Sequence, residues 1–148
     1  MDIRDLPLVD ASVPETATLA EAVEALFAAQ APAVAVVDPG RRLVALLTDG
    51  DVLRAVFPRY LGELRHTSFL TDDLLDLDGH ARLARDEPVR NFARVVEPLD
   101  GAESHAHAAE RFMHAGEQAL PVVEQGRFTG ILTISALCHA RLDQLVDD

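Results

Sequence analysis

The sequence of 148 residues lacks several features on which whole classes of protein depend. It has no lysine, since all 13 basic residues are arginine, and this excludes Schiff-base chemistry, a catalytic lysine and a phosphate-loop lysine. Its one cysteine, Cys138, cannot form an internal disulfide, so we expect a reducing, cytoplasmic setting. The N-terminus has no pattern of a secretion signal, and no apolar run approaches the roughly 18 residues that a membrane helix needs. No membrane partner is expected.

Positive charge is also scarce. The 13 basic residues face 25 acidic ones, which gives a formal charge of −12 and a pI near 4.7. Because this field repels a phosphate backbone, the composition argues against nucleic-acid binding. The length suits one compact domain or a pair of small subdomains with a real core.

An internal repeat organises the rest of the chain. Residues 19–37 recur at residues 105–123, and each copy continues through a glycine-containing turn into a second apolar run and a short helical segment. Identical residues recur 86 positions apart: Ala20, Ala22, Glu24, Ala29, Ala33, Val36 and Val37 correspond to Ala106, Ala108, Glu110, Ala115, Ala119, Val122 and Val123. Two copies predict two half-domains that share one pseudo-symmetric core.

Each copy has the local pattern helix, strand, turn, strand, helix. Thr18 and Glu21 form a capping box before the first helix, and Ser104 offers the cap in the second copy. The continuous apolar run 33–37 predicts a strand covered on both faces. The predicted buried helical stripes are Leu19, Val23, Leu26 and Phe27 in the first copy, and Ala109, Phe112 and Met113 in the second.

The copies define residues 1–57 as a first repeat and 93–148 as a second, joined by a connector at 58–92. In the connector we expect a short helix at 58–66, an acidic irregular stretch at 71–80 and a helix at 82–85 that ends before Pro88. A segment of this length is expected to pack across the pair.

A strand-to-helix motif closes each copy: glycine, two hydrophobic residues, Thr or Ser, two variable residues, then Asp or Asn. Residues 45–51 read ALLTDGD and residues 130–136 read GILTISA. With this motif and the preceding helix and strand, both copies closely resemble the cystathionine-β-synthase (CBS) domain, which occurs in tandem pairs, over about residues 8–56 and 93–143. The resemblance implies an α/β fold of two pseudo-symmetric β-α-β-β-α subdomains packed as one module.

The first motif has a physical interpretation of its own. Near Gly50 a strand ends and a helix begins, so free backbone amides and the positive end of the helix dipole point outward. The Thr48 hydroxyl can donate to a phosphate or ribose oxygen, and Asp51 can accept two hydrogen bonds from a ribose diol. The alternative is that Thr48, Asp49 or Gly50 simply caps the helix and Asp51 favours its dipole.

The resemblance implies an adenine nucleotide or S-adenosylmethionine as a regulatory ligand, with no cofactor required. Thr48 would contact phosphate and Asp51 the ribose, and the base would lie against the other copy: the residues implied there are Val95, Val96, Ala119 and Leu120.

The second motif departs from the family pattern. Ala136 stands at the Asp position, which leaves Thr133 without a ribose-binding partner. The loss should cost about 2–3 kcal/mol, or roughly 30- to 150-fold in affinity. In the first motif, Ala45 replaces the family glycine. We therefore expect one intact site and one degenerate site.

Other reactive side chains do not form a pattern of catalysis or metal binding. His105 and His107 would point about 200° apart on a helix, and no spaced carboxylate completes a ligand set with them. Ser104 lies beside His105, but helix capping accounts for it, and Cys138 is interpreted as a packed small hydrophobe. A proton switch at His105, which replaces Leu19 of the first copy, is a further alternative. No enzyme activity is expected.

Together these features predict a regulatory module that senses AMP, ADP, ATP or S-adenosylmethionine and signals to a separate, unidentified effector protein. The alternative is a protein-interaction or dimerisation module with decayed, unoccupied sites. The apolar stripe of the helix at 134–146, which includes Leu142 and Leu145, and its counterpart at residues 52–56 are most simply interpreted as core. They are also consistent with a homodimer, which the family resemblance implies. Arginine- and alanine-rich usage suggests a bacterial source.

Overall fold

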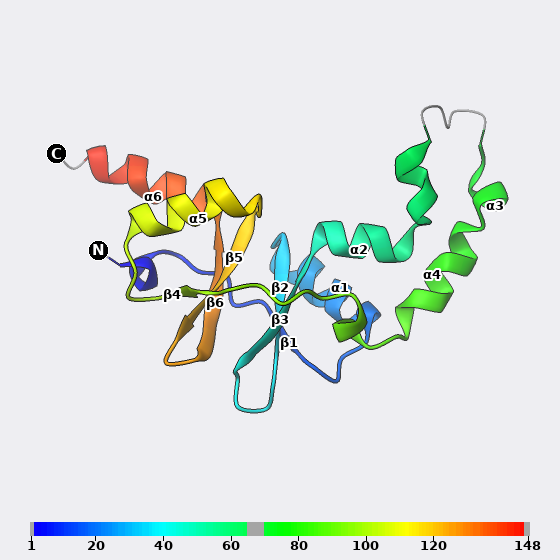
Figure 1. Cartoon of the computed structure of the whole chain (residues 1–148), viewed down its shortest axis with the longest axis horizontal. Helices are drawn as coiled ribbons and strands as arrows, with labels where there is room; N and C mark the ends of the chain where they lie inside the picture. The colour runs from blue at the N-terminus through cyan, green and yellow to red at the C-terminus, as the bar shows by residue number, and fades with distance from the viewer. Residues whose placement is uncertain (1, 65–69, 147–148) are drawn as a thin grey trace.

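A computed structural model describes residues 2–64 and 70–146, and it shows two three-stranded sheets side by side (Figure 1). The first repeat contains β1 (Ser12–Pro14), α1 (Leu19–Ala29), β2 (Ala33–Val37), β3 (Leu43–Thr48) and α2 (Asp49–Val56). The second contains β4 (Leu99–Asp100), α5 (His105–Ala115), β5 (Ala119–Glu124), β6 (Arg127–Thr133) and α6 (Ile134–Val146). Both halves have the predicted β-α-β-β-α order.

The two sheets share one topology. In each, a short first strand runs parallel to the middle strand, and the middle strand pairs antiparallel with the third. All five residues of β2 are buried, which confirms that both of its faces are covered. The hairpins also touch: the Phe128 amide donates to the Arg41 carbonyl at 2.8 Å, and the Arg41 guanidinium lies over the Phe128 ring.

Helices α1 and α5 begin directly after the capping residues that the sequence predicts. Thr18 and Glu21 form their capping box at α1, and the Ser104 hydroxyl accepts from the His107 amide at α5.

The predicted stripes on α1 and α5 are wrong at one residue each, since Phe27 is 84% exposed and Met113 is 83% exposed. Phe27 lies about 80° around the helix from Leu19, at the edge of the buried face. Met113 is its counterpart in the second repeat.

The two repeats exchange backbone. Val9, which lies before β1, pairs with Ile131 of β6 through hydrogen bonds of 2.9 and 2.8 Å. Arg94, which lies before β4, pairs with Leu46 of β3 through bonds of 2.8 and 2.9 Å. The two pairs are equivalent under a shift of 85 residues, so each sheet is extended by the chain that leads into the other repeat.

Two short 3-10 helices follow the same exchange. The helix η1 (Ile3–Asp5) packs into the core of the second repeat, and η3 (Val89–Asn91) packs into the core of the first. Ile3 and Val89, which are equivalent under a shift of 86, are both fully buried there. The two cores are therefore bound together through covalent chain as well as through packing.

The connector is more regular than predicted. It contains η2 (Arg59–Glu63), α3 (Asp72–Leu75) and α4 (Leu77–Arg85), and positions 65 and 66 of the expected first helix lie outside the described residues. The stretch 71–80 is helical because the Thr71 hydroxyl caps α3 and Asp76 adopts a left-handed conformation between α3 and α4. As predicted, the helix over 82–85 ends before Pro88.

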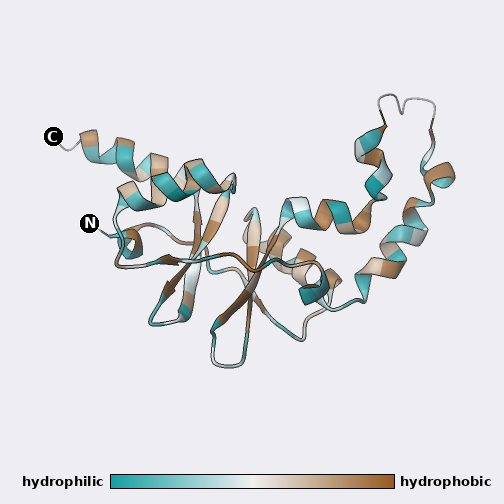
Figure 2. Cartoon of the chain, viewed as in Figure 1, coloured by the Kyte–Doolittle hydropathy of each residue, from teal (hydrophilic) through white to brown (hydrophobic). Residues whose placement is uncertain are grey.

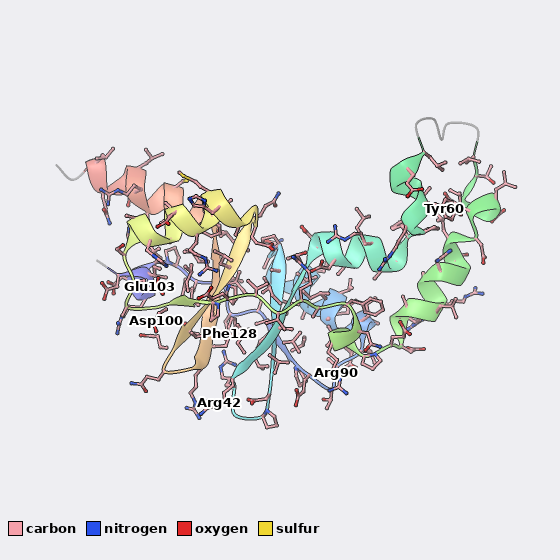
Figure 3. All side chains as sticks on the ribbon, viewed as in Figure 1. Arg42, Tyr60, Arg90, Asp100, Glu103 and Phe128 are labelled. Carbon is pink, nitrogen blue, oxygen red and sulfur yellow. The ribbon has the colours of Figure 1, made fainter. Side chains whose placement is uncertain are left out.

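The connector forms an arm on the side of the first repeat, away from both termini (Figure 1). Its helix α4 packs mainly against α2 and α1, rather than across the pair as expected. Tyr60 lies out on this arm (Figure 3).

Helix α6 buries less than its sequence suggests. Leu137 is buried, whereas Ile134, Cys138, Leu142 and Leu145 are exposed, which corrects the interpretation of Cys138 as a packed residue. Figure 2 shows that apolar, brown segments alternate with hydrophilic ones along α6. No helix in the described parts of the chain is both long and apolar enough to cross a membrane.

A close approach explains why one motif keeps glycine and the other does not. A Cβ on Gly130 would lie 2.6 Å from the Leu8 Cβ and 3.4 Å from the Val9 carbonyl oxygen. Under the 85-residue shift, the counterparts of Gly130 and Leu8 are Ala45 and Ala93. Glycine is thus paired with the large side chain of Leu8, whereas Ala45, with its additional methyl group, is paired with the small side chain of Ala93.

We expect Gly130→Ala to lower the free energy of unfolding by about 1–3 kcal/mol, because the added methyl overpacks the contact with Leu8. Leu8→Ala in the same chain should restore part of that loss. Urea unfolding measures both. Gly62→Ala is the control, since a Cβ there has no neighbour within 4 Å among the described residues, and equal effects at both glycines would contradict the steric explanation.

Candidate functional site

A cleft of about 430 Å³ opens between the two repeats at the start of α2. Residues from both sides line it: Pro32, Thr48, Asp49, Gly50 and Arg54 come from the first repeat, and Arg94 and residues 115–119 from the second half. The cleft exists because β3 ends at Thr48 directly opposite the loop between α5 and β5.

Thr48 and Asp51 form a capping box at this edge. The Thr48 hydroxyl accepts from the Asp51 amide at 3.1 Å, and Asp51 Oδ2 accepts from the Thr48 amide at 3.0 Å. The capping interpretation of the motif therefore describes the structure as it stands. Capping leaves Asp51 Oδ1 for other partners.

Two arginines occupy those remaining acceptor positions. Arg54 Nη2 donates to Asp51 Oδ1 at 2.7 Å, and Arg94 Nε donates to Oδ1 at 3.1 Å and to Oδ2 at 3.3 Å. The other end of the Arg94 guanidinium reaches Glu117 Oε1 at 3.1 Å. The resulting network joins α2, the segment before the second repeat and the loop after α5, so it links the two halves of the molecule.

The network sets the charge state of Asp51, which is 6% exposed. Burial alone raises the pKa of this carboxyl, but hydrogen bonds from Thr48 and Arg54 and the charge of Arg94 outweigh burial and hold the pKa below its ordinary value. The hydrogen bond to Glu117, together with the charge of Asp51, raises the pKa of Arg94. Asp51 is thus held in its ionised form between two half-exposed guanidinium groups.

The structure brings some of the residues of the predicted site together and separates others. Thr48, Gly50 and Ala119 line the cleft, while Asp51 lies behind Arg54 and Arg94. Val95 is 89% exposed and Val96 is half-buried, whereas Leu120 is fully buried in the core of the second repeat.

Sequence reasoning missed Arg54, Arg94 and Glu117. Arg54 follows Asp51 by three residues on a helix, a spacing that could have indicated the pair. Arg94 and Glu117 carry no such signal, because only the exchange of backbone between the repeats brings them to Asp51.

The second motif has the same backbone with none of these charges. The Thr133 hydroxyl caps α6 by accepting from the Ala136 amide at 3.1 Å. The positions equivalent to Asp51, Arg54, Arg94 and Glu117 hold Ala136, His139, Val9 and Ala31. The whole network is therefore missing there, beyond the one carboxylate whose absence the sequence makes obvious.

His105 and the other histidines do not assemble a metal site. His105 is buried, and its Nε2 has no hydrogen-bond partner in the described structure. His107 pairs with Glu103, which precedes the N-cap of α5. Among residues 2–64 and 70–146, no three His, Cys, Asp or Glu side chains are grouped so that they could hold a metal ion.

The lowered pKa of Asp51 predicts a pH-dependent contribution to stability. Its ionised form stabilises the fold above the unfolded pKa of about 3.9, and this contribution is lost as the pH falls through the lower folded value. At pH 7, Asp51→Asn should lower the free energy of unfolding by about 1–2 kcal/mol, since both arginines are partly solvated.

Urea unfolding of both proteins between pH 7 and pH 3 tests this, and the difference should shrink below about pH 4. Asp49→Asn removes an exposed carboxylate from the same turn and should change stability by less than about 0.5 kcal/mol. If the difference in unfolding free energy between the wild type and Asp51→Asn stayed constant from pH 7 to pH 3, it would contradict the stabilising role of ionised Asp51.

Comparison with known proteins agrees with this architecture. The family model "CBS domain" matches the chain twice, at residues 3–58 and 92–143. None of the curated proteins matches the sequence.

Solved structures match over nearly the whole chain. A CBS domain-containing protein from Kribbella flavida is 20% identical over 96% of this chain and 99% of its own, with a TM-score of 0.74. The AMP complex of the CBS domain protein PAE2072 from Pyrobaculum aerophilum is 22% identical over all of both chains, with a TM-score of 0.72. CBSX2, also in complex with AMP, is 19% identical over 96% of each chain, with a TM-score of 0.70. With its two repeats, each matched in sequence and in fold, the chain belongs to the CBS domain family.

Proposed function

We propose that this protein is a regulatory module that binds an adenosyl ligand, AMP, ADP, ATP or S-adenosylmethionine, in the cleft at the start of α2, and that a separate protein responds to the bound state. The observation that carries the proposal is the network of Asp51, Arg54, Arg94 and Glu117 at the edge of that cleft. Two relatives of the same fold, CBSX2 and PAE2072, are complexes with AMP, which supports an adenine nucleotide.

The network suits a nucleotide because the phosphate and the ribose each have a partner of the right chemistry. Guanidinium groups bind phosphate through paired hydrogen bonds, and the N-terminus of α2 favours an anion. Ribose hydroxyls can donate to Asp51 once its arginines turn toward the phosphate. The ligand thereby replaces an internal ion-pair network rather than filling an empty site.

This exchange gives the ligand a way to act on the rest of the molecule. Arg94 is held by Asp51 of the first repeat and by Glu117 of the second. A phosphate that recruits Arg94 therefore changes the contacts that join the repeats, and its differential affinity shifts their equilibrium arrangement. An effector protein that contacts both repeats would recognise this change.

Thermal unfolding and calorimetry with AMP, ADP, ATP and S-adenosylmethionine test the proposal. A ligand at 100 times its dissociation constant should stabilise the fold by about 2.7 kcal/mol. Asp51→Ala should weaken binding tenfold or more, because the ribose loses its acceptor.

Thr133→Ala is the matched control, since it removes a helix cap from the second motif and should leave affinity unchanged. No binding of any of these ligands would refute the proposal in favour of an interaction module with unoccupied sites.

We also propose that the module forms a homodimer through its outer helices. Phe27 on α1 and Met113 on α5 occupy equivalent positions 86 residues apart, and both are exposed. With Leu53, Leu142 and Leu145 they leave an apolar face on each repeat, which suits a two-fold interface.

The mass in solution, measured by light scattering over a range of concentrations, should be that of a dimer. Phe27→Glu combined with Met113→Glu should give monomers, because both charges would be desolvated at the interface. Leu83→Glu, at an equally exposed leucine on the connector, should leave the dimer intact. A wild-type protein that is monomeric throughout would contradict the proposal.

A further inference from the structure

A second cavity, of about 490 Å³, lies on the other side of Arg54 and Arg94 from the nucleotide cleft. Its walls come from α2, the turn that follows α2, the helix α4 and the segment around η3. The lining residues are Asp51, Arg54, Ala55, Phe57, Pro58, Arg59, His80, Asn91, Phe92 and Arg94. Among the described residues, Arg94 is the last in the chain that lines the cavity, so the cavity is formed by the first repeat, the connector and the start of the second repeat.

The connector gives the cavity a composition that the family match does not account for. Arg59, His80 and Asn91 lie between the two matched segments, 3–58 and 92–143. Arg59 follows α2 on η2, His80 reaches the cavity because α4 packs against α2, and Asn91 comes from η3. The cavity therefore depends on residues of the connector, which lies between the two matched segments.

The lining is positively charged although the protein is strongly acidic. Arg54, Arg59 and Arg94 contribute three positive charges and Asp51 one negative charge, which leaves an excess of two in a chain with a net charge of −12. Asp51 already binds Arg54 and Arg94. The Arg59 side chain has neither a hydrogen bond nor an ion pair with any residue in the described ranges 2–64 and 70–146.

Other lining groups favour a polar ligand of some size. His80 and Asn91 add side-chain hydrogen-bonding groups, while Phe57 and Phe92 provide apolar walls that strengthen electrostatic attraction. The volume is larger than one phosphate requires and falls in the range of roughly 300–1,000 Å³ typical of small-molecule sites.

We propose that this connector cavity binds a phosphate group, with Arg59 as its dedicated ligand and Arg54 and Arg94 as ligands shared with the nucleotide cleft. Guanidinium groups bind phosphate oxygens in pairs, and three of them converge here. The phosphate has two possible sources: a separate phosphorylated anion, or the terminal phosphates of the nucleotide in the neighbouring cleft. The second source rests on the proposed function, and the first does not.

Calorimetric titrations at constant ionic strength distinguish the sources, with pyrophosphate, AMP and ATP as probes. The variant is Arg59→Gln, and the matched control is Arg82→Gln, which makes the same change of charge at an exposed position of α4 outside the cavity. Thermal unfolding without ligand checks that both variants are folded. A general effect of net charge would weaken binding equally in the two variants.

If the anion is separate, pyrophosphate alone binds to saturation, and Arg59→Gln weakens this binding tenfold or more while Arg82→Gln does not. If the phosphate belongs to the nucleotide, ATP binds at least tenfold more tightly than AMP, and only Arg59→Gln removes that advantage. Pyrophosphate binding that depends on Arg59, in a protein that binds none of AMP, ADP, ATP and S-adenosylmethionine, would refute the proposed nucleotide function and support the cavity. The cavity proposal is overturned if Arg59→Gln affects neither pyrophosphate binding nor the ratio of ATP to AMP affinity.

Discussion

The backbone pairing between each sheet and the segment that leads into the other repeat is the constraint on which this structure depends. Four hydrogen bonds, between Val9 and Ile131 and between Leu46 and Arg94, extend the two third strands. They satisfy edge groups that would otherwise need water or another chain. Because η1 and η3 follow the same exchange, neither repeat has a complete core without chain from the other.

This exchange also creates the candidate site. The bond between Leu46 and Arg94 fixes the Arg94 backbone beside β3, two residues before the strand ends at Thr48. The Arg94 side chain then reaches both Asp51 and Glu117. A backbone interaction that serves the fold therefore positions the charged network that serves the proposed function, and a ligand that alters the network acts on the junction of the repeats.

The pseudo-symmetry of the backbone contrasts with the asymmetry of the side chains. Both motifs cap their helices with a threonine, yet only the first surrounds that cap with Asp51, Arg54 and Arg94. The connector increases this asymmetry, since it packs on the first repeat and adds Arg59 and His80 beside the same network. Three arginines thus lie beside α2, and two neighbouring cavities share Arg54 and Arg94.

Local pattern was enough to determine the elements of the repeats, the capping boxes, the burial of β2 and the difference between the two motifs, because these features depend on residues a few positions apart. The order of helices in the connector was harder to predict, since the left-handed Asp76 and the cap at Thr71 turn an acidic stretch into two short helices. Helical periodicity also placed Phe27, Met113 and Leu142 in buried stripes, and only the packing of whole helices shows that they remain exposed. The tertiary structure alone decided that Arg94 and Glu117 meet at Asp51, because residues 43 and 66 positions away come within hydrogen-bonding reach only when two sheets exchange their backbone.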